Sequence, residues 1–164
     1  MHLDFRIREI EPSEHPQLEI FLYEAIYIPE GQKKVDKEII RLPELWRYIK
    51  DFGQKNDICL VAETDNKLIG AIWTRIYPAA ERGYGYVDSE TPELSMSVLK
   101  EYQQKGVGTR LLEKMLVKLT EYEFEQVSLS VDLQNYAVRL YQKFGFVISE
   151  SDGKSAIMIK KLKE

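Results

Sequence analysis

The spacing of apolar and polar residues changes several times along the chain, and it predicts strands alternating with helices. In residues 3–7, apolar side chains alternate with charged ones, as they do in a half-buried strand. Residues 12–28 have the spacing of a helix, and residues 34–51 form a second helical region that Pro43 interrupts. We therefore expect the N-terminal third to be one strand followed by two helical segments.

From residue 57 the pattern becomes typical of strands. Residues 58–63 and 67–77 are rich in β-branched and apolar side chains, and Asp65 and Asn66 separate them, as in a hairpin. Residues 78–92 follow as a loop that is long enough to indicate a functional segment rather than a simple connection.

The next segment combines a strand over residues 94–99, a glycine-bearing turn and an amphipathic helix. Apolar residues recur on one face of that helix, at Leu111, Leu112, Met115, Leu116 and Leu119. A strand over residues 126–132 follows, so the three elements predict a right-handed crossover between two parallel strands.

The C-terminal segment predicts one more helix and a hairpin. Asn135 is a helix-capping residue type, Gly145 ends the helix, and Asp-Gly at 152–153 joins strands over residues 146–149 and 156–160. The predicted element order is β-α-α-β-β-β-α-β-α-β-β. It describes an α/β (α+β) fold with a mixed sheet and helices on both faces, in a single domain over residues 1–164.

Composition limits the functions that fit. The chain of 164 residues is 44% hydrophobic and 30% charged with a net charge of -4, which fits a soluble globular domain and disfavours general nucleic-acid binding. Cys59 is the only cysteine, and His2 and His15 are isolated, so we expect no disulfide and no metal site. No run of about 18 apolar residues occurs, so we expect no membrane partner and a cytoplasmic location.

The turn within residues 102–112 is the strongest chemical signal. Gly106 and Gly108 let the backbone turn tightly and direct several N–H groups at one point, where the positive end of the helix dipole favours an anion such as a diphosphate. A phosphate-loop NTPase is disfavoured because no Lys-Ser or Lys-Thr follows Gly108. A dinucleotide site is disfavoured because Leu111 replaces the third glycine of its fingerprint. Taken alone, the two glycines fit a ligand-free helix entry equally well.

Two blocks, residues 93–112 and 129–146, resemble the GNAT superfamily of N-acetyltransferases. Gln103, Gly106 and Gly108 fit the family pattern Arg/Gln-x-x-Gly-x-Gly/Ala, and the second block, LSVDLQNYAVRLYQKFGF, is similar to the family's other conserved segment. Lys100 and Gln104 depart mildly from the pattern, at positions where proline and glycine are common. The resemblance covers about residues 57–161. It implies a mostly antiparallel sheet of six to seven strands whose central parallel pair splays apart.

The resemblance also implies acetyl-CoA as cosubstrate and no metal. The diphosphate of acetyl-CoA would bind the main chain of one turn, which comprises Gln103, Gln104, Lys105, Gly106, Val107, Gly108 and Thr109. Pantetheine would meet the main chain at Met96, Val98 and Leu99, with one N–H near Val98 or Leu99 polarising the thioester carbonyl. Asn135 would lie near the cofactor, although a plain helix cap is the other interpretation.

By the same resemblance, Tyr141 protonates the leaving thiolate and Glu93 takes a proton from the amine. Tyr141 also fits a core aromatic position, and Asp88 and Glu90 are rivals of Glu93 as the base. The family's acceptor route implicates Tyr86 and six further candidates: Tyr27, Glu30, Trp73, Arg75, Tyr77 and Tyr84.

The leading hypothesis is an acetyl-CoA-dependent N-acetyltransferase in which a primary amine attacks the thioester directly within a ternary complex. The acceptor is left open between a small molecule and a protein amine, and RNA is the least favoured alternative. A non-catalytic acyl-CoA-binding sensor or assembly module is the alternative function. Homodimers are common among family members, but the sequence identifies no interface.

Overall fold

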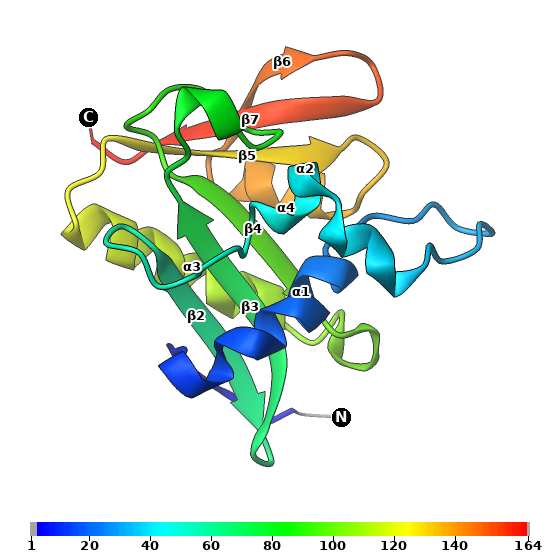
Figure 1. Ribbon diagram of the computed structural model, residues 1–164. Coiled ribbons are helices and arrows are strands. Elements are labelled where there is room, and N and C mark those ends of the chain that lie inside the picture. Colours follow the sequence, from blue (N-terminus) through cyan, green and yellow to red (C-terminus); the bar gives the residue numbers. More distant parts are fainter. Residues whose placement is uncertain (1–2, 164) are drawn as a thin grey trace.

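The computed structural model describes residues 3–163, so His2 lies outside the described residues. These residues form one seven-stranded sheet in the order β1-β2-β3-β4-β5-β7-β6 (Figure 1). In that spatial order, the strands are β1 (Arg6–Glu9), β2 (Ile58–Thr64), β3 (Lys67–Arg75), β4 (Glu93–Val98), β5 (Gln126–Asp132), β7 (Ser155–Lys161) and β6 (Val147–Ser151). The mixed sheet predicted from the sequence is confirmed.

The centre of the sheet is its only parallel pairing within residues 3–163, between β4 and β5. Their register contains a single pair, Glu93 opposite Ser128, and the Ser128 N–H donates to the Pro92 carbonyl at 3.0 Å. β5 then pairs with β7 over its whole length, and β4 pairs with β3 over its whole length. The two central strands therefore pair only near their N-terminal ends and separate beyond them, as the predicted splay requires.

Helices cover both faces of the sheet (Figure 1). On one face, α3 (Val107–Glu121) buries the apolar stripe that the sequence predicts, and α4 (Ala137–Lys143) adds Tyr141 to the same core. On the other face, α1 (Leu18–Glu24) and the segment around α2 (Pro43–Trp46) enclose a second core that includes Trp73. No helix of residues 3–163 is long and apolar enough to cross a membrane.

The two N-terminal helical predictions are correct in place but wrong in extent. Residues 12–28 contain a 3-10 helix, η1 (Pro12–Gln17), and only seven residues of α-helix. Pro16 lies inside η1, and its missing N–H prevents regular helical hydrogen bonding there. The second region is divided into η2 (Lys37–Arg41) and the single turn α2, because Leu42 precedes a proline and is extended. Two further 3-10 turns, η3 (Ala79–Glu81) and η4 (Lys100–Tyr102), lie before and after β4.

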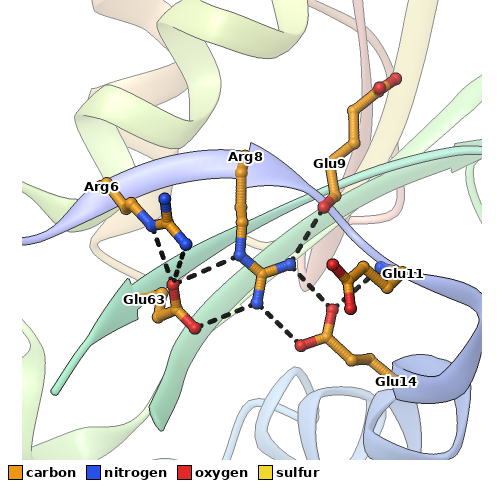
Figure 2. Close-up of polar contacts among 6 residues, drawn as sticks. All are labelled: Arg6, Arg8, Glu9, Glu11, Glu14 and Glu63. Carbon is orange, nitrogen blue, oxygen red and sulfur yellow. Dashed lines mark hydrogen bonds and ion pairs between the residues drawn. The ribbon is translucent and has the colours of Figure 1, made fainter. Parts of the chain in front are cut away.

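The outer edge of the sheet is joined to η1 by a cluster of charged residues (Figure 2). Arg8 donates to both oxygens of Glu14, at 2.7 and 2.8 Å, and to both oxygens of Glu63, at 3.1 and 3.3 Å. Arg6 adds a further bond to Glu63 at 2.8 Å. The Arg8 hydrogen bonds lower the pKa of Glu14 to about 2. This charged cluster therefore fixes the start of the first helical segment against β1 and β2.

Candidate active site

A cavity of about 510 Å³ lies where β4 and β5 separate. Among the predicted site residues, it brings together Glu93, Met96, Asn135 and Tyr141, with Tyr27 and Tyr84. The rest of the lining comes from α1, α2, the residues that follow these two helices, and the two strands: Leu22, Ala25, Ile26, Leu45, Tyr48, Leu94, Ser95, Ser130, Val131 and Asp132. Residues that are far apart in the sequence, from Leu22 to Tyr141, thus line the gap that the splay creates.

The cavity reaches both faces of the sheet. Side chains alternate along β4, so Glu93 and Ser95 lie on the face of α1 and α2, while Leu94 and Met96 belong to the core under α3. Ser97 also shares the face of Glu93, and its hydroxyl donates to the Phe21 carbonyl at 2.7 Å. A carboxylate on one face and the Tyr141 phenol on the other can therefore approach a ligand from opposite sides.

Glu93 is buried, with 3% of its surface exposed. The Tyr48 hydroxyl donates to its Oε2 at 2.6 Å, whereas its Oε1 has no hydrogen-bond partner among the described residues. Burial raises the pKa of Glu93 to about 7, and hydrogen bonding from the Tyr48 hydroxyl and from the Gly85 main chain partly opposes that rise. The rivals Asp88 and Glu90 are exposed and line a different cavity. Glu93 is thus a carboxyl group whose protonation changes near neutral pH.

Tyr141 is both a core residue and a cavity residue, so the two interpretations of the sequence are compatible. Its ring packs against Phe146 with a centroid distance of 5.5 Å, and it also lines the cavity. Burial raises the pKa of the Tyr141 phenol well above its ordinary value. The phenol therefore keeps its proton at neutral pH and remains a hydrogen-bond donor.

The predicted anion-binding turn forms the start of α3. Gly106 has φ of +86°, a left-handed conformation that favours glycine, and the first helical bond runs from the Arg110 N–H to the Gly106 carbonyl at 3.1 Å. The N–H groups of Val107, Gly108 and Thr109 therefore have no partner within the helix. A Cβ on Gly108 would approach no atom closer than 3.6 Å, so the fold itself has room for a side chain there. These donors at the start of the helix fit a diphosphate.

The main-chain N–H groups of β4 and of Leu99, which follows it, alternate in direction. The Leu99 N–H donates to the Ile69 carbonyl at 2.9 Å, so β3 already uses this donor. Hydrogen-bonding direction alternates along the strand, so the main-chain groups of Met96 and Val98 are directed toward β5 and the gap. Gln103 Nε2 donates to the Val98 carbonyl at 3.0 Å, which fixes the turn to the strand end. The N–H groups of Met96 and Val98 are therefore directed toward the gap, and that of Leu99 is not.

Asn135 performs the local task expected of a capping residue. Its Oδ1 accepts a hydrogen bond from the Ala137 N–H at 2.9 Å, at the first residue of α4. The residue also lines the cavity, and its amide nitrogen is a further donor group. The two interpretations of the sequence therefore do not exclude each other.

The predicted acceptor residues separate into two groups. Tyr27 and Tyr84 line the cavity, whereas Glu30 is exposed and outside its lining. Trp73, Arg75 and Tyr77 are buried in the fold: the Trp73 Nε1–H donates to the Tyr48 carbonyl, Arg75 pairs with Asp57, and Tyr77 packs edge-on against Tyr48. These three, with Glu30, are not cavity residues, and Tyr86 lies under Arg82, also outside the lining.

Sequence reasoning missed the apolar wall of the cavity and its hydrogen-bonding tyrosine. Leu22, Ala25, Ile26 and Leu45 form the wall, and Tyr48 holds Glu93. Helical periodicity marks these side chains only as buried, because core and cavity positions have the same spacing. The Gly-Tyr-Gly-Tyr run at residues 83–86 was the available signal, since that loop contacts Glu93 and Tyr48.

A sequence profile described as the acetyltransferase (GNAT) family matches residues 21–146. The chain belongs to this family. An N-alpha-acetyltransferase of Saccharolobus solfataricus is 32% identical over 122 residues, which are 65% of this chain and 68% of that protein. N-alpha-acetyltransferase 30 of Homo sapiens is 24% identical over 145 residues, which cover 85% of this chain and 38% of that protein. The chain thus spans well under half the length of the human relative.

Solved structures show the same fold. The PaiA N-acetyltransferase of Thermoplasma acidophilum, in complex with coenzyme A, is 25% identical, with a TM-score of 0.65 over 97% of this chain and 99% of that one. YncA of Salmonella typhimurium, with its cofactor acetyl-CoA, has a TM-score of 0.71 at 18% identity, over 99% and 96% of the two chains. The GNAT fold predicted from the sequence is confirmed.

Proposed function

We propose that this protein is an acetyl-CoA-dependent N-acetyltransferase. The observation that carries the proposal is the cavity between β4 and β5, which places Glu93, with a pKa of about 7, and the protonated Tyr141 at one gap in the sheet. Family membership and relatives named N-alpha-acetyltransferase support it. A cytoplasmic location, a single domain and formation of a homodimer stay predictions.

The residues present fit the proposed cosubstrate. The Val107, Gly108 and Thr109 N–H groups supply donors for the diphosphate at the positive end of a 15-residue helix, and Lys105 and Arg110 border an adjoining hollow. Met96 and Val98 offer main-chain groups at the edge of β4, where amide groups of pantetheine would complete the open ladder. Acetyl-CoA supplies an activated acyl group as a thioester.

We further propose direct transfer to the amine. Glu93 Oε1 accepts a proton from the amine, whose nitrogen forms a bond to the acetyl carbon, and the carbon–sulfur bond breaks. The departing thiolate takes the Tyr141 proton. Cys59 lies in β2 outside the cavity lining, and burial raises the pKa of its thiol, which disfavours a covalent acyl-cysteine route. Direct attack within a ternary complex is therefore the favoured route.

The cavity also supports a class of acceptor. Among the residues that the structure describes, its lining contains two carboxylates, Glu93 and Asp132, and no Lys, Arg or His, while α1, α2 and the residues after them supply an apolar wall. A cationic amine next to an apolar group fits this arrangement. Protein α-amines join small amines among the acceptors to test, since the relatives are named N-alpha-acetyltransferases.

The direct test is a screen of small amines and short peptides with detection of the CoA thiol released from acetyl-CoA. We expect turnover with at least one amine, and a lower kcat for Tyr141→Phe with unchanged CoA affinity. Calorimetric binding of CoA without turnover of any amine would favour the alternative, a non-catalytic acyl-CoA-binding sensor or assembly module. CoA released in a burst before acceptor is added would overturn direct transfer.

A further inference from the structure

Three segments that are distant in the sequence meet at Glu93: the chain after α2, the loop between β3 and β4, and β4 itself. The Tyr48 hydroxyl accepts a hydrogen bond from the Tyr84 N–H at 2.7 Å and donates its own proton to Glu93 Oε2 at 2.6 Å. A phenol has only one proton to donate. The loop N–H therefore orients the hydroxyl, and the hydroxyl orients the carboxylate.

The loop backbone approaches this pair closely at Gly83 and approaches β5 closely at Gly85. A Cβ on Gly83 would overlap Glu93 Oε1 and would lie 2.7 Å from the Tyr48 hydroxyl. A Cβ on Gly85 would lie 2.6 Å from the Leu129 carbonyl carbon on β5. The Ser128 hydroxyl also donates to the Gly85 carbonyl at 2.7 Å. The loop is thereby pressed against both central strands at the start of the gap.

The two oxygens of Glu93 are consequently unequal. Oε2 is occupied by the Tyr48 proton, whereas Oε1 is buried without a partner among residues 3–163. Burial and the neighbouring Glu93 raise the pKa of Tyr48 far above its ordinary value, so its hydroxyl does not ionise. Oε1 is the oxygen that remains able to take a proton.

Among residues 3–163, no cation forms an ion pair with Glu93. On β3, Arg75 is the cross-strand neighbour of Glu93, but Asp57 neutralises it through a hydrogen bond of 3.1 Å, and its guanidinium also donates to the Arg47 carbonyl. The titratable and charged groups that face this region from the surrounding elements are Tyr27, Arg47, Asp57, Arg75, Tyr77, Tyr84, Asp132 and Tyr141. Tyr48 is therefore the principal side-chain partner of Glu93.

We propose that Tyr48 is a positioning residue. Its hydroxyl, which the Tyr84 N–H orients, occupies Glu93 Oε2. Glu93 Oε1 is therefore the oxygen that accepts the proton of the acceptor amine. The proton-accepting role rests on the proposed function, whereas the positioning of Glu93 can be tested without turnover. Tyr48 does not exchange a proton with substrate in this arrangement. It acts through Glu93.

The hydroxyl favours the ionised form of Glu93, so its removal raises the pKa of that carboxyl. A hydrogen bond to a charged group corresponds to a shift of about one to two pH units. In Tyr48→Phe the ring that packs against Tyr77 remains and only the hydroxyl is lost. Tyr77→Phe is the matched control, because it removes the hydroxyl of the adjacent buried ring.

The deciding experiment is an NMR titration of protein labelled with 13C at the glutamate carboxyl, in which Glu93 is assigned by the signal that disappears in Glu93→Gln. We expect a midpoint near pH 7 in the wild type. It should be about one to two units higher in Tyr48→Phe and unchanged in Tyr77→Phe. Equal midpoints in folded wild type and Tyr48→Phe would overturn the proposal.

Hydrogen exchange of the wild type provides a second measurement that does not depend on a variant folding. Tyr84 is 59% exposed, yet its N–H bonds to Tyr48, so we expect this amide to exchange more slowly than an unbonded loop amide. Unprotected exchange would contradict the positioning role. If no amine is acetylated but both measurements hold, the proposed function fails and the positioning of Glu93 stands.

Discussion

Two glutamates with little exposed surface occupy opposite environments, one in the cavity and one in the charged cluster of Figure 2. Glu93 accepts a hydrogen bond from a neutral hydroxyl, and burial raises its pKa to about 7. Glu14 lies against the Arg8 guanidinium, and those hydrogen bonds lower its pKa to about 2. The same side chain is therefore poised for proton transfer in one region and fixed as an anion in the other.

The difference shows which property to look for in a reactive carboxylate. A guanidinium with two parallel bonds offsets the cost of removing a carboxylate from water, whereas a hydroxyl offsets only part of it. Glu14 therefore contributes to the fold, and its loss should be felt in stability. Glu93 retains the ability to bind a proton near neutral pH, and its loss should be felt in activity.

The largest expected effect is that of Glu93→Gln on acetylation. The amide preserves the size of the side chain but cannot accept the amine proton, so kcat/KM should fall by about 10²–10⁴-fold. The matched control is Glu14→Gln, which should leave kcat/KM unchanged and lower the unfolding free energy. Steady-state kinetics with urea unfolding would check both, and equal activity losses in the two variants would remove the distinction between the regions.

Arg8→Met should have the next largest effect, and on stability alone. It leaves two partly buried carboxylates without their shared cation, so we expect the unfolding free energy to fall by about 2 kcal/mol. Urea denaturation measures this loss, and kcat/KM of the folded fraction should not change. Arg8→Met combined with Glu14→Gln should cost less than the sum of the two single changes, because both remove the same interaction.

Gly108→Ala extends the comparison to the anion-binding turn and should weaken CoA binding about tenfold, or about 1.4 kcal/mol. The Cβ fits the free protein, so stability should be unchanged or rise by as much as about 1 kcal/mol, the helix preference of alanine over glycine. Calorimetry with CoA and thermal unfolding without ligand separate the two effects. Unaltered CoA affinity would place the diphosphate elsewhere.

The smallest effect is the pH dependence of stability. The pKa of Glu93 is higher folded than unfolded, so the folded state binds more protons and stability rises by about 1 kcal/mol from pH 7 to 6. The pKa of Glu14 is lower in the folded state than in the unfolded state. Its contribution to stability is therefore complete above about pH 4.5 and is lost as the pH falls toward 2. Urea unfolding across this range should show that Glu93→Gln removes only the first change and Glu14→Gln only the second.

Local signals in the sequence predicted much of the fold. The hairpin at Asp65 and Asn66, both with positive φ, and the Gly106 turn depend on conformations within a few residues. The stripe on α3 depends on spacing along one helix. The first two helical segments were predicted less well, because Pro16 and Pro43 divide them into short turns whose type depends on packing.

The sequence by itself determined the strand–turn–helix that can bind an anion, and through its motif the family and the candidates Glu93 and Tyr141. Only the tertiary structure decided that Arg75, Trp73 and Tyr77 belong to the core and that Tyr48, 45 positions before Glu93, holds it. The physical reason is the distance along the chain over which each interaction acts. Turn and helix preferences act between near neighbours, whereas the pKa of a carboxyl depends on how much water and charge the rest of the chain leaves around it.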